Sequence, residues 1–393
     1  MLGLTLPPPY PDELIGSVLC RAAVHLGLSY KQMVPTILGT SQVTLSFFLP
    51  SALSRLASLM RKDAEQVLWQ NTVFPYAVAF MPLEEVERMK RKVLANDGSL
   101  AALIQSATNG MTGLRYCPDC VSHDIQTFGE SYWHRAHNLP ACHVCLVHDQ
   151  PLHVTSIDMA KSSRACAYGV PQYLSGAPSA PALEITLQHA LASASHRLCT
   201  APQTAKQSHL EQYHRQAQTK GYEMKDGQIA SSQVSHDLTQ FYGEDYLDSL
   251  GVGMRSRVKG WPAMMVRPGT TVPFSPVKHV LLRTFLEQCP EGSKELAYRP
   301  PGKAPLDPAT LDPQLAKMVR RARIRANQRL VTMTATKLMQ STGHWQAFRH
   351  KRSQFPLTEA ELLAFRASEA SERKLGGRAA HQRNMARKKA SKL

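Results

Sequence analysis

The sequence has no long hydrophobic run, and this absence excludes a chain that crosses a membrane as an apolar helix. No stretch of its 393 residues approaches the roughly 20 apolar residues that such a helix needs. The first residues also lack the basic and apolar segments of a secretory signal peptide. We therefore expect a cytoplasmic protein that has no contact with a membrane.

Cysteine is scarce, because 8 residues in the whole chain are too few for the disulfide framework of a secreted scaffold. Four of them lie close together between residues 117 and 145, which indicates metal ligands in a reducing compartment. Cys166 and Cys199 stand alone in the sequence. A second zinc site that uses either of them would need distant partners, and the sequence leaves that question open.

Motifs of enzymes that act on nucleotides or nucleic acids are missing as well. The sequence has no Walker motif, no H-E-x-x-H and no zinc deaminase signature. No nucleophile with a matching base and no carboxylate cluster is evident. We therefore expect a protein that is not an enzyme, and these absences weaken the alternative of a zinc-dependent enzyme acting on nucleic acid.

Acidic residues are nearly missing from the last fifth of the chain. Residues 313–393 carry 19 Lys and Arg but only 4 Asp and Glu, whereas the preceding 312 residues carry 27 and 26. Almost all of the net charge of +16 therefore lies in this segment. Such asymmetry favours a polyanionic partner, and we expect double-stranded DNA. A basic tail that only keeps the protein in solution is an alternative that charge alone leaves open.

Two short pairs of metal-binding residues stand near the middle of the chain. Cys117 and Cys120 form a C-x2-C pair, and Cys145 and His148 form a C-x2-H pair. Each pair can offer two ligands from one tight turn, and zinc binds four such ligands in a tetrahedron. Because the protein can fill all four positions, the expected cofactor is a structural Zn2+ that folds a small module.

Other donors in the same stretch keep alternatives open. The rival ligand set is Cys117, Cys120, Cys142 and Cys145, since Cys142 also precedes Cys145 by three residues. His137 and His143 are further candidate donors. A metal-free group of buried cysteines is the structural alternative. The pair Cys145 and His148 is favoured because it repeats the spacing of the first pair.

Helical periodicity recurs along most of the chain and predicts a mainly α, multi-domain protein. Asp12 is the expected cap of a first helix that ends at Gly27, and Ser29 is the expected cap of a second. The expected parts are an N-terminal helical domain of helix-turn-helix type (1–110), a zinc-finger module (111–158), a helical domain (182–300), a basic helix-turn-helix-like domain (313–370) and a basic flexible tail (371–393). For the first of these, a docking domain that never touches DNA is an equal alternative.

Smaller expectations concern the packing within these parts. Trp133 and Leu139 are expected to fill the core of the zinc module. His279, on an apolar helix, is expected to be a packing residue rather than a ligand. Residues 159–181 are rich in small residues and predict a loop, and the prolines and glycine of residues 302–313 predict a linker.

The basic C-terminal segment has the pattern of a DNA-binding helix-turn-helix. Helices are expected over residues 314–330, 335–341 and 345–352, with a turn at Gly343 and with Trp345 and Phe348 as core anchors. The candidate DNA contacts are basic side chains on these helices and in the tail. They are Arg320, Arg321, Arg323, Arg325, Arg349, Lys351, Arg352, Arg387, Lys388 and Lys389.

The chain resembles the TniQ/TnsD family, the target-selection proteins of heteromeric transposons. The resembling motifs are P-D-E-L-I-G-S at residues 11–17, Y-C-P-x-C at 116–120, Y-W-H-R-x-H-x-L-P at 132–140 and C-x-x-H at 145–148. The resemblance implies that Cys117, Cys120, Cys145 and His148 bind zinc. Leu146 and Asp149 depart from the proline and glycine that are usual there in the family, which affects the turns but not the ligands.

A looser resemblance favours the TnsD branch. It is carried in order by residues 221–222, 229, 241–243, 247–251, 261, 267 and 276–279. It implies a protein without chemistry of its own that marks an insertion site on DNA, recruits a TnsC-like AAA+ ATPase regulator and associates with the bacterial nucleoid when bound. The alternative is a TniQ adaptor that docks on a CRISPR effector such as Cascade. Whether the protein forms a homodimer is left open.

Overall fold

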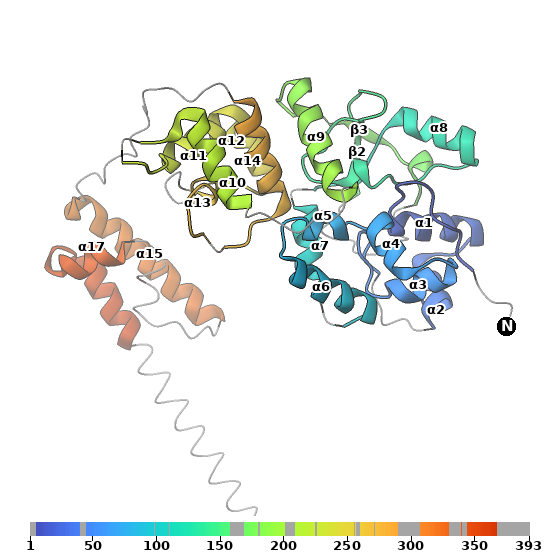
Figure 1. Ribbon diagram of the computed structural model, residues 1–393. Coiled ribbons are helices and arrows are strands. Elements are labelled where there is room, and N and C mark those ends of the chain that lie inside the picture. The colour runs from blue at the N-terminus through green and yellow to red at the C-terminus, as the bar shows by residue number, and fades with distance from the viewer. Residues whose placement is uncertain are drawn as a thin grey trace, which may run out of the picture. The chain divides into compact units, whose positions relative to one another are not determined.

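Helices dominate the structure, a computed structural model, and the expected mainly α fold is confirmed (Figure 1). The structure describes residues 5–39, 45–97, 99–109, 111–157, 169–179, 181–200, 209–224, 226–254, 256, 260–270, 272–289, 307–329, 339 and 344–367. No helix of the described residues is long and apolar enough to span a membrane. The chain divides into two compact units, residues 1–300 and 301–393.

The first unit begins with a group of short helices. They are α1 (Ile15–Leu26), α2 (Tyr30–Leu38), α3 (Leu53–Leu59), α4 (Ala64–Asn71), α5 (Phe74–Val78), α6 (Leu83–Ala95) and α7 (Ala101–Thr108). As expected, α1 ends at Gly27, which adopts the left-handed conformation with φ 62°, and Ser29 with Gln32 forms a capping box for α2.

Asp12 is not the cap of α1, and that expectation was wrong. The helix starts at Ile15, and the preceding residue, Leu14, makes no side-chain capping bond. Asp12 instead has φ 54°, and its carboxylate accepts hydrogen bonds from Arg135 Nε at 3.0 Å and Ala136 N at 2.8 Å. Asp12 is therefore not at the N-cap position, which Leu14 occupies, and its carboxylate binds a distant segment instead.

A small antiparallel sheet frames the predicted zinc module. Its strands, in the order β1-β2-β3, are β1 (Arg115–Tyr116), β2 (His153–Thr155) and β3 (Gly176–Pro178). Between β1 and β2 lie α8 (Pro118–Phe128) and the short 3-10 helix η1 (Ala136–Asn138), and η3 (Pro171–Tyr173) precedes β3. The expected loop over residues 159–181 therefore contains an edge strand. Gly176 permits this pairing, since a Cβ there would stand 2.8 Å from the Val154 carbonyl oxygen.

One hydrophobic core joins the N-terminal helices to the segment that carries the candidate metal ligands. It runs from Leu6 to Cys199 and includes Cys117, Trp133 and Leu139. Trp133 and Leu139 are both 0% exposed, so their predicted packing role is confirmed. The boundary expected near residue 110 therefore does not separate two hydrophobic cores.

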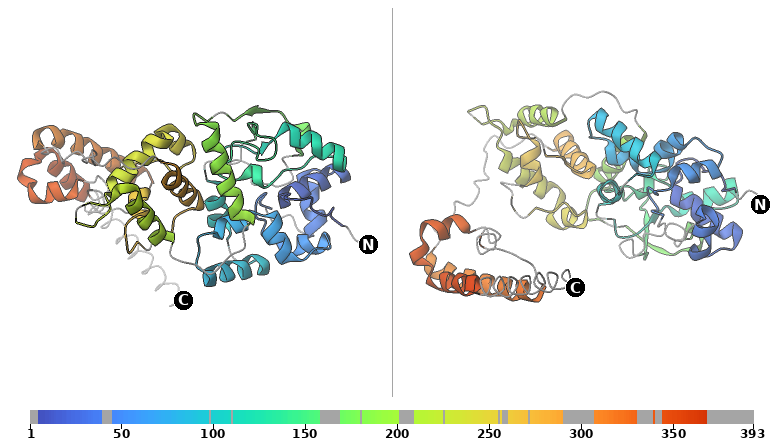
Figure 2. Two further views of the ribbon diagram at one scale, coloured as in Figure 1. Left: turned by 45° about the horizontal axis from the view of Figure 1, so that its top comes forward. Right: turned by 90° about the horizontal axis from the view of Figure 1, so that it is seen from below.

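A second core fills the later part of the same unit. Its helices are α9 (Ile185–Thr200), α10 (His209–Ala217), the π-helix η4 (Gln218–Tyr222), α11 (Ser231–Tyr242), α12 (Glu244–Ser249), α13 (Trp261–Met265) and α14 (Pro276–Gln288). Helix α9 packs against α5 as well as α14 and so contacts both cores (Figures 1 and 2). His279 is buried, bonds to the Tyr213 hydroxyl at 3.1 Å and stacks on Phe80, which confirms its packing role.

The second unit contains the basic segment. Its described elements are α15 (Pro308–Arg329), α17 (Trp345–His350), the 3-10 helix η5 (Arg352–Gln354) and a helix over residues 356–367. Phe348 is buried and Trp345 packs against the same core, as expected. The sequence did not predict the last helix. The expected helix over 335–341 and the turn at Gly343 lie outside the described residues, apart from residue 339, which is helical.

The expected linker over residues 302–313 was wrong for the part that the structure describes. Residues 308–313 belong to α15. Proline at the start of a helix loses no hydrogen bond, because the first N–H groups have no partner within the helix. Pro308 therefore begins the helix, whereas Pro313 lies inside it and leaves one backbone hydrogen bond of the helix unformed. Asp312, between them, is buried and binds the helix over residues 356–367.

We expect Asp312→Ala to destabilise the second unit by about 0.5–2 kcal/mol, the usual effect of losing a helix cap. The Asp312 carboxylate accepts from Leu357 N and Thr358 N, each at 2.8 Å, at the start of the last helix. Denaturant unfolding measures the effect. Asp312→Asn keeps one acceptor oxygen and should lose less, whereas equal stability of all three proteins would show that these bonds do not stabilise the unit.

Candidate metal centre

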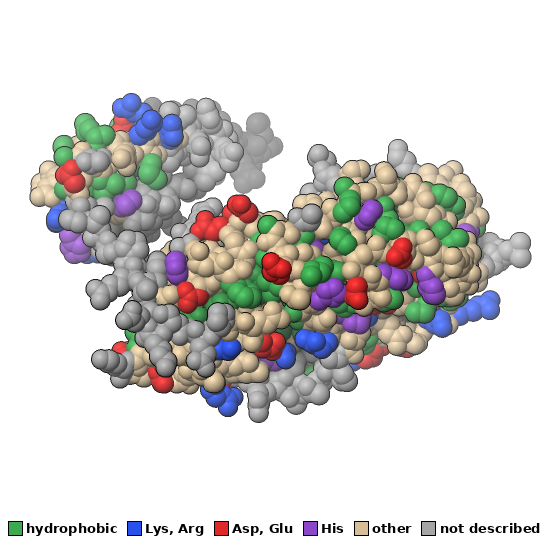
Figure 3. All heavy atoms as spheres, turned by 90° about the horizontal axis from the view of Figure 1, so that it is seen from above, with side chains coloured by type: hydrophobic (Ala, Val, Ile, Leu, Met, Phe, Trp, Pro, Cys, Tyr) green, Lys and Arg blue, Asp and Glu red, His purple; other side chains and the backbone are tan. Residues whose placement is uncertain are grey.

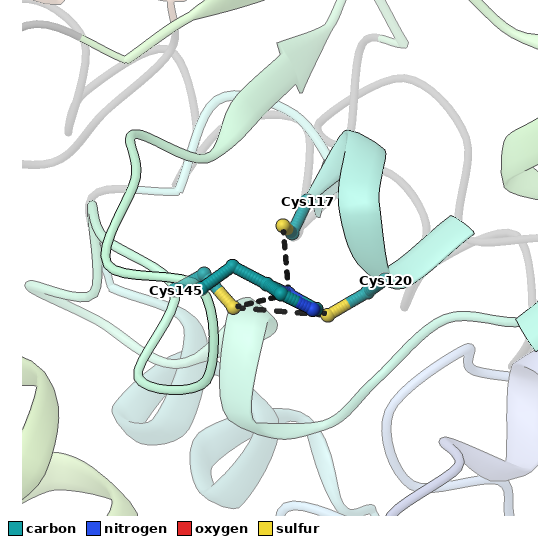
Figure 4. A group of neighbouring side chains, drawn as sticks. Cys117, Cys120 and Cys145 are labelled. Carbon is teal, nitrogen blue, oxygen red and sulfur yellow. Dashed lines mark hydrogen bonds between the residues drawn. The ribbon is translucent and has the colours of Figure 1, made fainter. Parts of the chain in front are cut away.

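Three cysteines and one histidine converge on a common point within the first unit. Figure 4 shows Cys117 and Cys120 approaching from the start of α8, while Cys145 comes from a loop. Cys117 is the N-cap of α8 and Cys120 lies in its first turn, so the helix fixes their spacing. The loop is tightened by hydrogen bonds from Cys145 N to Gln150 O and from Asp149 N to Cys145 O. This turn carries His148 to the same point.

The distances match those of a tetrahedral zinc site. The four ligand atoms all lie within 4.8 Å of one another. The Sγ atoms of Cys120 and Cys145 are 3.7 Å apart, and His148 Nδ1 lies 3.5, 3.3 and 3.7 Å from the sulfurs of Cys117, Cys120 and Cys145. Usual zinc–ligand distances around a tetrahedron give about 3.8 Å between sulfurs and about 3.6 Å between sulfur and nitrogen. The cluster could therefore bind a metal ion, and it is compatible with zinc.

The electrostatics of the cluster also suit a cation. Contact with the thiol of Cys117 raises the pKa of Cys120, since neighbouring sulfurs cannot all carry negative charge unaided. The N-terminus of α8 adds a favourable field for thiolates. A bound dication removes the conflict, because it holds coordinating thiols in the deprotonated form. This is the chemistry expected of a metal ligand set rather than of four inert buried residues.

Cys142, the residue that replaces His148 in the rival ligand set, lies outside this group. Its thiol donates to the Val144 carbonyl oxygen at 3.7 Å, and burial raises its pKa to about 12. His143 is hydrogen-bonded to Ser179 Oγ at 2.7 Å. His137 lies beside the cluster, with Nε2 3.8 Å from Cys120 Sγ. The group that the described residues bring together is Cys117, Cys120, Cys145 and His148.

Gln150 is a neighbour of the centre that sequence reasoning missed. Its side-chain amide donates to Cys117 Sγ at 3.5 Å and also to the Asp119 carboxylate. Hydrogen bonds of this kind orient metal ligands and moderate the charge on sulfur. No local pattern marks such a residue, because a glutamine two positions after the last ligand is not distinctive.

A buried ion pair joins the first helix to the metal-binding part. The Arg21 guanidinium bonds to both carboxylate oxygens of Glu13, each at 2.9 Å, and to Glu130 Oε1 at 2.8 Å. Arg21 and Glu13 are 1% and 0% exposed, and the guanidinium lies over the Tyr10 ring. Removing one partner of such a buried pair typically destabilises a protein by about 3–5 kcal/mol. The pair therefore fixes the N-terminal segment against the part that carries the candidate metal ligands.

Further hydrogen bonds, from backbone and side chains, stabilise the same contact between the N-terminal segment and residues 130–138. Arg135 donates to the Trp69 carbonyl at 2.7 Å as well as to Asp12. Leu14 N donates to Trp133 O at 3.0 Å, and Trp133 N donates to Ser17 Oγ at 2.9 Å. The motifs at residues 11–17 and 132–140 thus contact each other directly. Most residues of these two motifs are buried and stabilise the fold, so they do not form a surface that a partner could bind.

The predicted DNA-contacting residues lie in different environments. Arg320 pairs with Glu361 and Arg352 pairs with Glu359, each at 2.6 Å. All of the predicted contacts whose side chains the structure describes are exposed: Arg320, Arg321, Arg349, Lys351 and Arg352. The side chains of Arg323 and Arg325, and the tail residues Arg387, Lys388 and Lys389, lie outside the described part of the chain. The face drawn in Figure 3 mixes acidic, basic, histidine and apolar side chains.

Comparison with known proteins gives two successive family matches. The model of the TniQ family matches residues 4–152, which include the whole metal centre. The model described as Tn7-like transposition protein D matches residues 191–307, which cover most of the second core. The transposon Tn7 transposition protein TnsD of Escherichia coli is 28% identical over 258 residues. That alignment covers 62% of this chain and 50% of the relative, so the chain spans about half of the relative's length.

The comparisons agree with the geometry of the first unit. The TniQ match covers the N-terminal helices, strand β1 and the joint around Arg21, and the second match begins within α9, the helix that contacts both cores. The resemblance noted in the sequence is thereby confirmed for both of its parts. Two family matches in this order, together with the similarity to TnsD, show that the chain belongs to the TniQ/TnsD family of transposition proteins.

Proposed function

We propose that the protein selects the target site of a transposon by binding double-stranded DNA and recruiting a AAA+ ATPase regulator of the transposase. The observation that carries the proposal is the succession of a TniQ region and a TnsD region in one chain, followed by a strongly basic unit. The related protein of Escherichia coli is named as a transposition protein, which supports a role in the same process. The role proposed here is binding and recruitment rather than catalysis.

A structural zinc ion is the second part of the proposal. Three thiols and one imidazole supply a complete set of protein ligands, which leaves no position for a substrate or an activated water. The ligands lie within or beside the core that the N-terminal helices share. Zinc would therefore hold the helical segment and the small sheet in one folded body that presents the rest of the chain to its partners.

The basic second unit is the proposed DNA-binding part. Lys and Arg on its surface would neutralise phosphates, a contribution that does not depend on sequence and weakens with salt. Arg349 and Arg352, at and just beyond the end of α17, are among the side chains proposed to contact the DNA. Neither matched family nor the relative's name mentions a CRISPR effector, and no observation favours a homodimer, so direct DNA recognition is the function proposed.

Selection from a pool of random duplexes should test this function. We expect the full chain to enrich one sequence, to bind it more tightly than a scrambled duplex of equal composition, and to retain the ATPase regulator on that DNA. The same protein should neither hydrolyse ATP nor cut DNA. If it enriches no sequence, and the regulator is retained only when a guide-RNA complex is added, the adaptor role replaces the proposed one.

A further inference from the structure

A small hollow opens between α17 and the helix over residues 356–367 of the second unit. Its volume is about 110 Å³. It is lined by Trp345, Phe348, Arg349, Arg352, Glu359, Leu362, Leu363 and Arg366. Phe348 and Leu362 are buried and form its floor, whereas Arg349, Leu363 and Arg366 are exposed and form its rim. The hollow thus combines an apolar base with three guanidinium groups.

The three arginines are not equivalent. Arg352 is held by Glu359, with Nη2 2.6 Å from the carboxylate, and the two side chains are 51% and 32% exposed. Within residues 307–329 and 344–367, ion pairs engage Arg320 and Arg352 but not Arg349 or Arg366. Among these described residues, two cations of the hollow are therefore presented without a carboxylate partner, while the third is restrained beside them.

We propose that this hollow binds a phosphate of the DNA backbone, that Arg366 acts beside Arg349 in holding it, and that Glu359 restrains Arg352. The proposal rests on the DNA-binding function proposed above and adds a site and two residues that the sequence did not indicate. A guanidinium offers paired N–H donors that match phosphate oxygens, and two of them converge here from successive helices. The apolar base suits the sugar that adjoins a phosphate.

The charge of the second unit favours DNA over an acidic peptide as the partner. The excess of 15 positive charges over residues 313–393 suits a continuous polyanion better than one acidic side chain. The start of the last helix is closed to phosphate, since the Asp312 carboxylate accepts from Leu357 N and Thr358 N. Anion binding by this helix must therefore come from side chains nearer its end, where Arg366 lies.

Two substitutions should shift the affinity in opposite directions. Arg366→Gln should weaken binding to target and scrambled duplexes alike, by about two- to fivefold, the range for one exposed ion pair. The slope of log affinity against log salt should become shallower by about 0.9, the value for one phosphate contact. Glu359→Gln should strengthen binding to both duplexes by a similar factor, because it removes a repelling charge and releases Arg352. A role in folding alone would weaken binding in both variants.

Arg283→Gln and Glu287→Gln are matched controls on α14. This pair has a similar length, 2.7 Å, and similar exposure, 48% and 43%, but lies in the first unit. Neither control should alter affinity, and unfolding curves should show that all four variants remain folded. An unchanged affinity for Arg366→Gln, or a weaker one for Glu359→Gln, would refute the site.

The outcomes also separate this site from the wider function. If the unaltered chain binds no duplex at any salt concentration, the proposed function itself fails. If it binds normally while Arg366→Gln and Glu359→Gln are silent, only the phosphate site fails. If the two variants alter capture of the ATPase regulator without altering affinity for DNA, the hollow holds an acidic segment of a protein and the proposal is overturned.

Discussion

Replacing Cys145 with serine should remove the bound metal and unfold the first unit around the centre, rather than only reduce its activity. Metal binding at structural zinc sites contributes about 10–16 kcal/mol of folding free energy, whereas whole domains are stable by only about 5–15 kcal/mol. Cys145 is fully buried and belongs to the core shared with the N-terminal helices. The zinc content, measured by elemental analysis, should therefore fall from about one zinc per chain to almost none. Soluble protein and cooperative thermal unfolding should be lost as well.

Cys142→Ala is the matched control for this prediction. Cys142 is buried three residues before Cys145, but its thiol donates a hydrogen bond to Val144 O and lies outside the ligand group. This variant should keep its zinc and unfold cooperatively, with only the modest destabilisation expected for removing a buried sulfur. A Cys142→Ala protein that loses zinc while Cys145→Ser keeps it would show that the rival ligand set is correct. A well-folded preparation without metal would exclude the site altogether.

Removing the second unit should abolish site-specific DNA binding while the first unit stays folded. A chain shortened to residues 1–306 ends before α15 and keeps the metal centre and both cores of the first unit. Specific binding typically exceeds non-specific binding by about a thousandfold or more, so we expect at least this loss of affinity for the target duplex. Zinc content and the unfolding temperature of the first unit provide the control, because both should stay unchanged.

Deleting only residues 371–393 should have a different effect. This tail has 8 Lys and Arg and one acidic residue, and it contains Arg387, Lys388 and Lys389. Its removal should weaken binding to target and scrambled duplexes equally and flatten the salt dependence, by about 0.9 in slope for each phosphate that the tail neutralises. Affinities at several salt concentrations measure both effects.

The outcome that would contradict the role of the second unit concerns the shorter chain. If the chain shortened to residues 1–306 keeps full affinity for the target duplex and full preference over the scrambled one, DNA recognition lies in the first unit or in a partner.

The sequence alone determined the features that depend on neighbouring residues. The two pairs of candidate metal ligands were evident because a C-x2-C and a C-x2-H spacing each place two donors in one turn. The C-terminal end of α1 and the start of α2 were evident because Gly27 favours a left-handed φ and Ser29 is a favoured N-cap residue. The positive charge of the last part of the chain needed no structure at all.

Sequence reasoning failed where a residue's partner is remote along the chain. Asp12 had the local features of a helix cap, but it bonds to Arg135, 123 residues away. Asp312 lay in an expected linker, yet it caps a helix that begins more than 40 residues later, since Thr358 N is 46 residues away. Local patterns report the conformation of a short segment, whereas these bonds exist only after distant segments have packed together.

The same distinction holds for the metal centre and its surroundings. Spacing left Cys142 and His148 as competing ligands, because each stands three residues from Cys145. The fold separated them, since the turn stabilised by Gln150 O directs His148 to the cluster while Cys142 faces Val144. The buried link from Glu13 through Arg21 to Glu130, which spans 109 residues between Arg21 and Glu130, was likewise set by tertiary packing alone. Burial makes such charges require partners, and only the folded arrangement decides which partners are within reach.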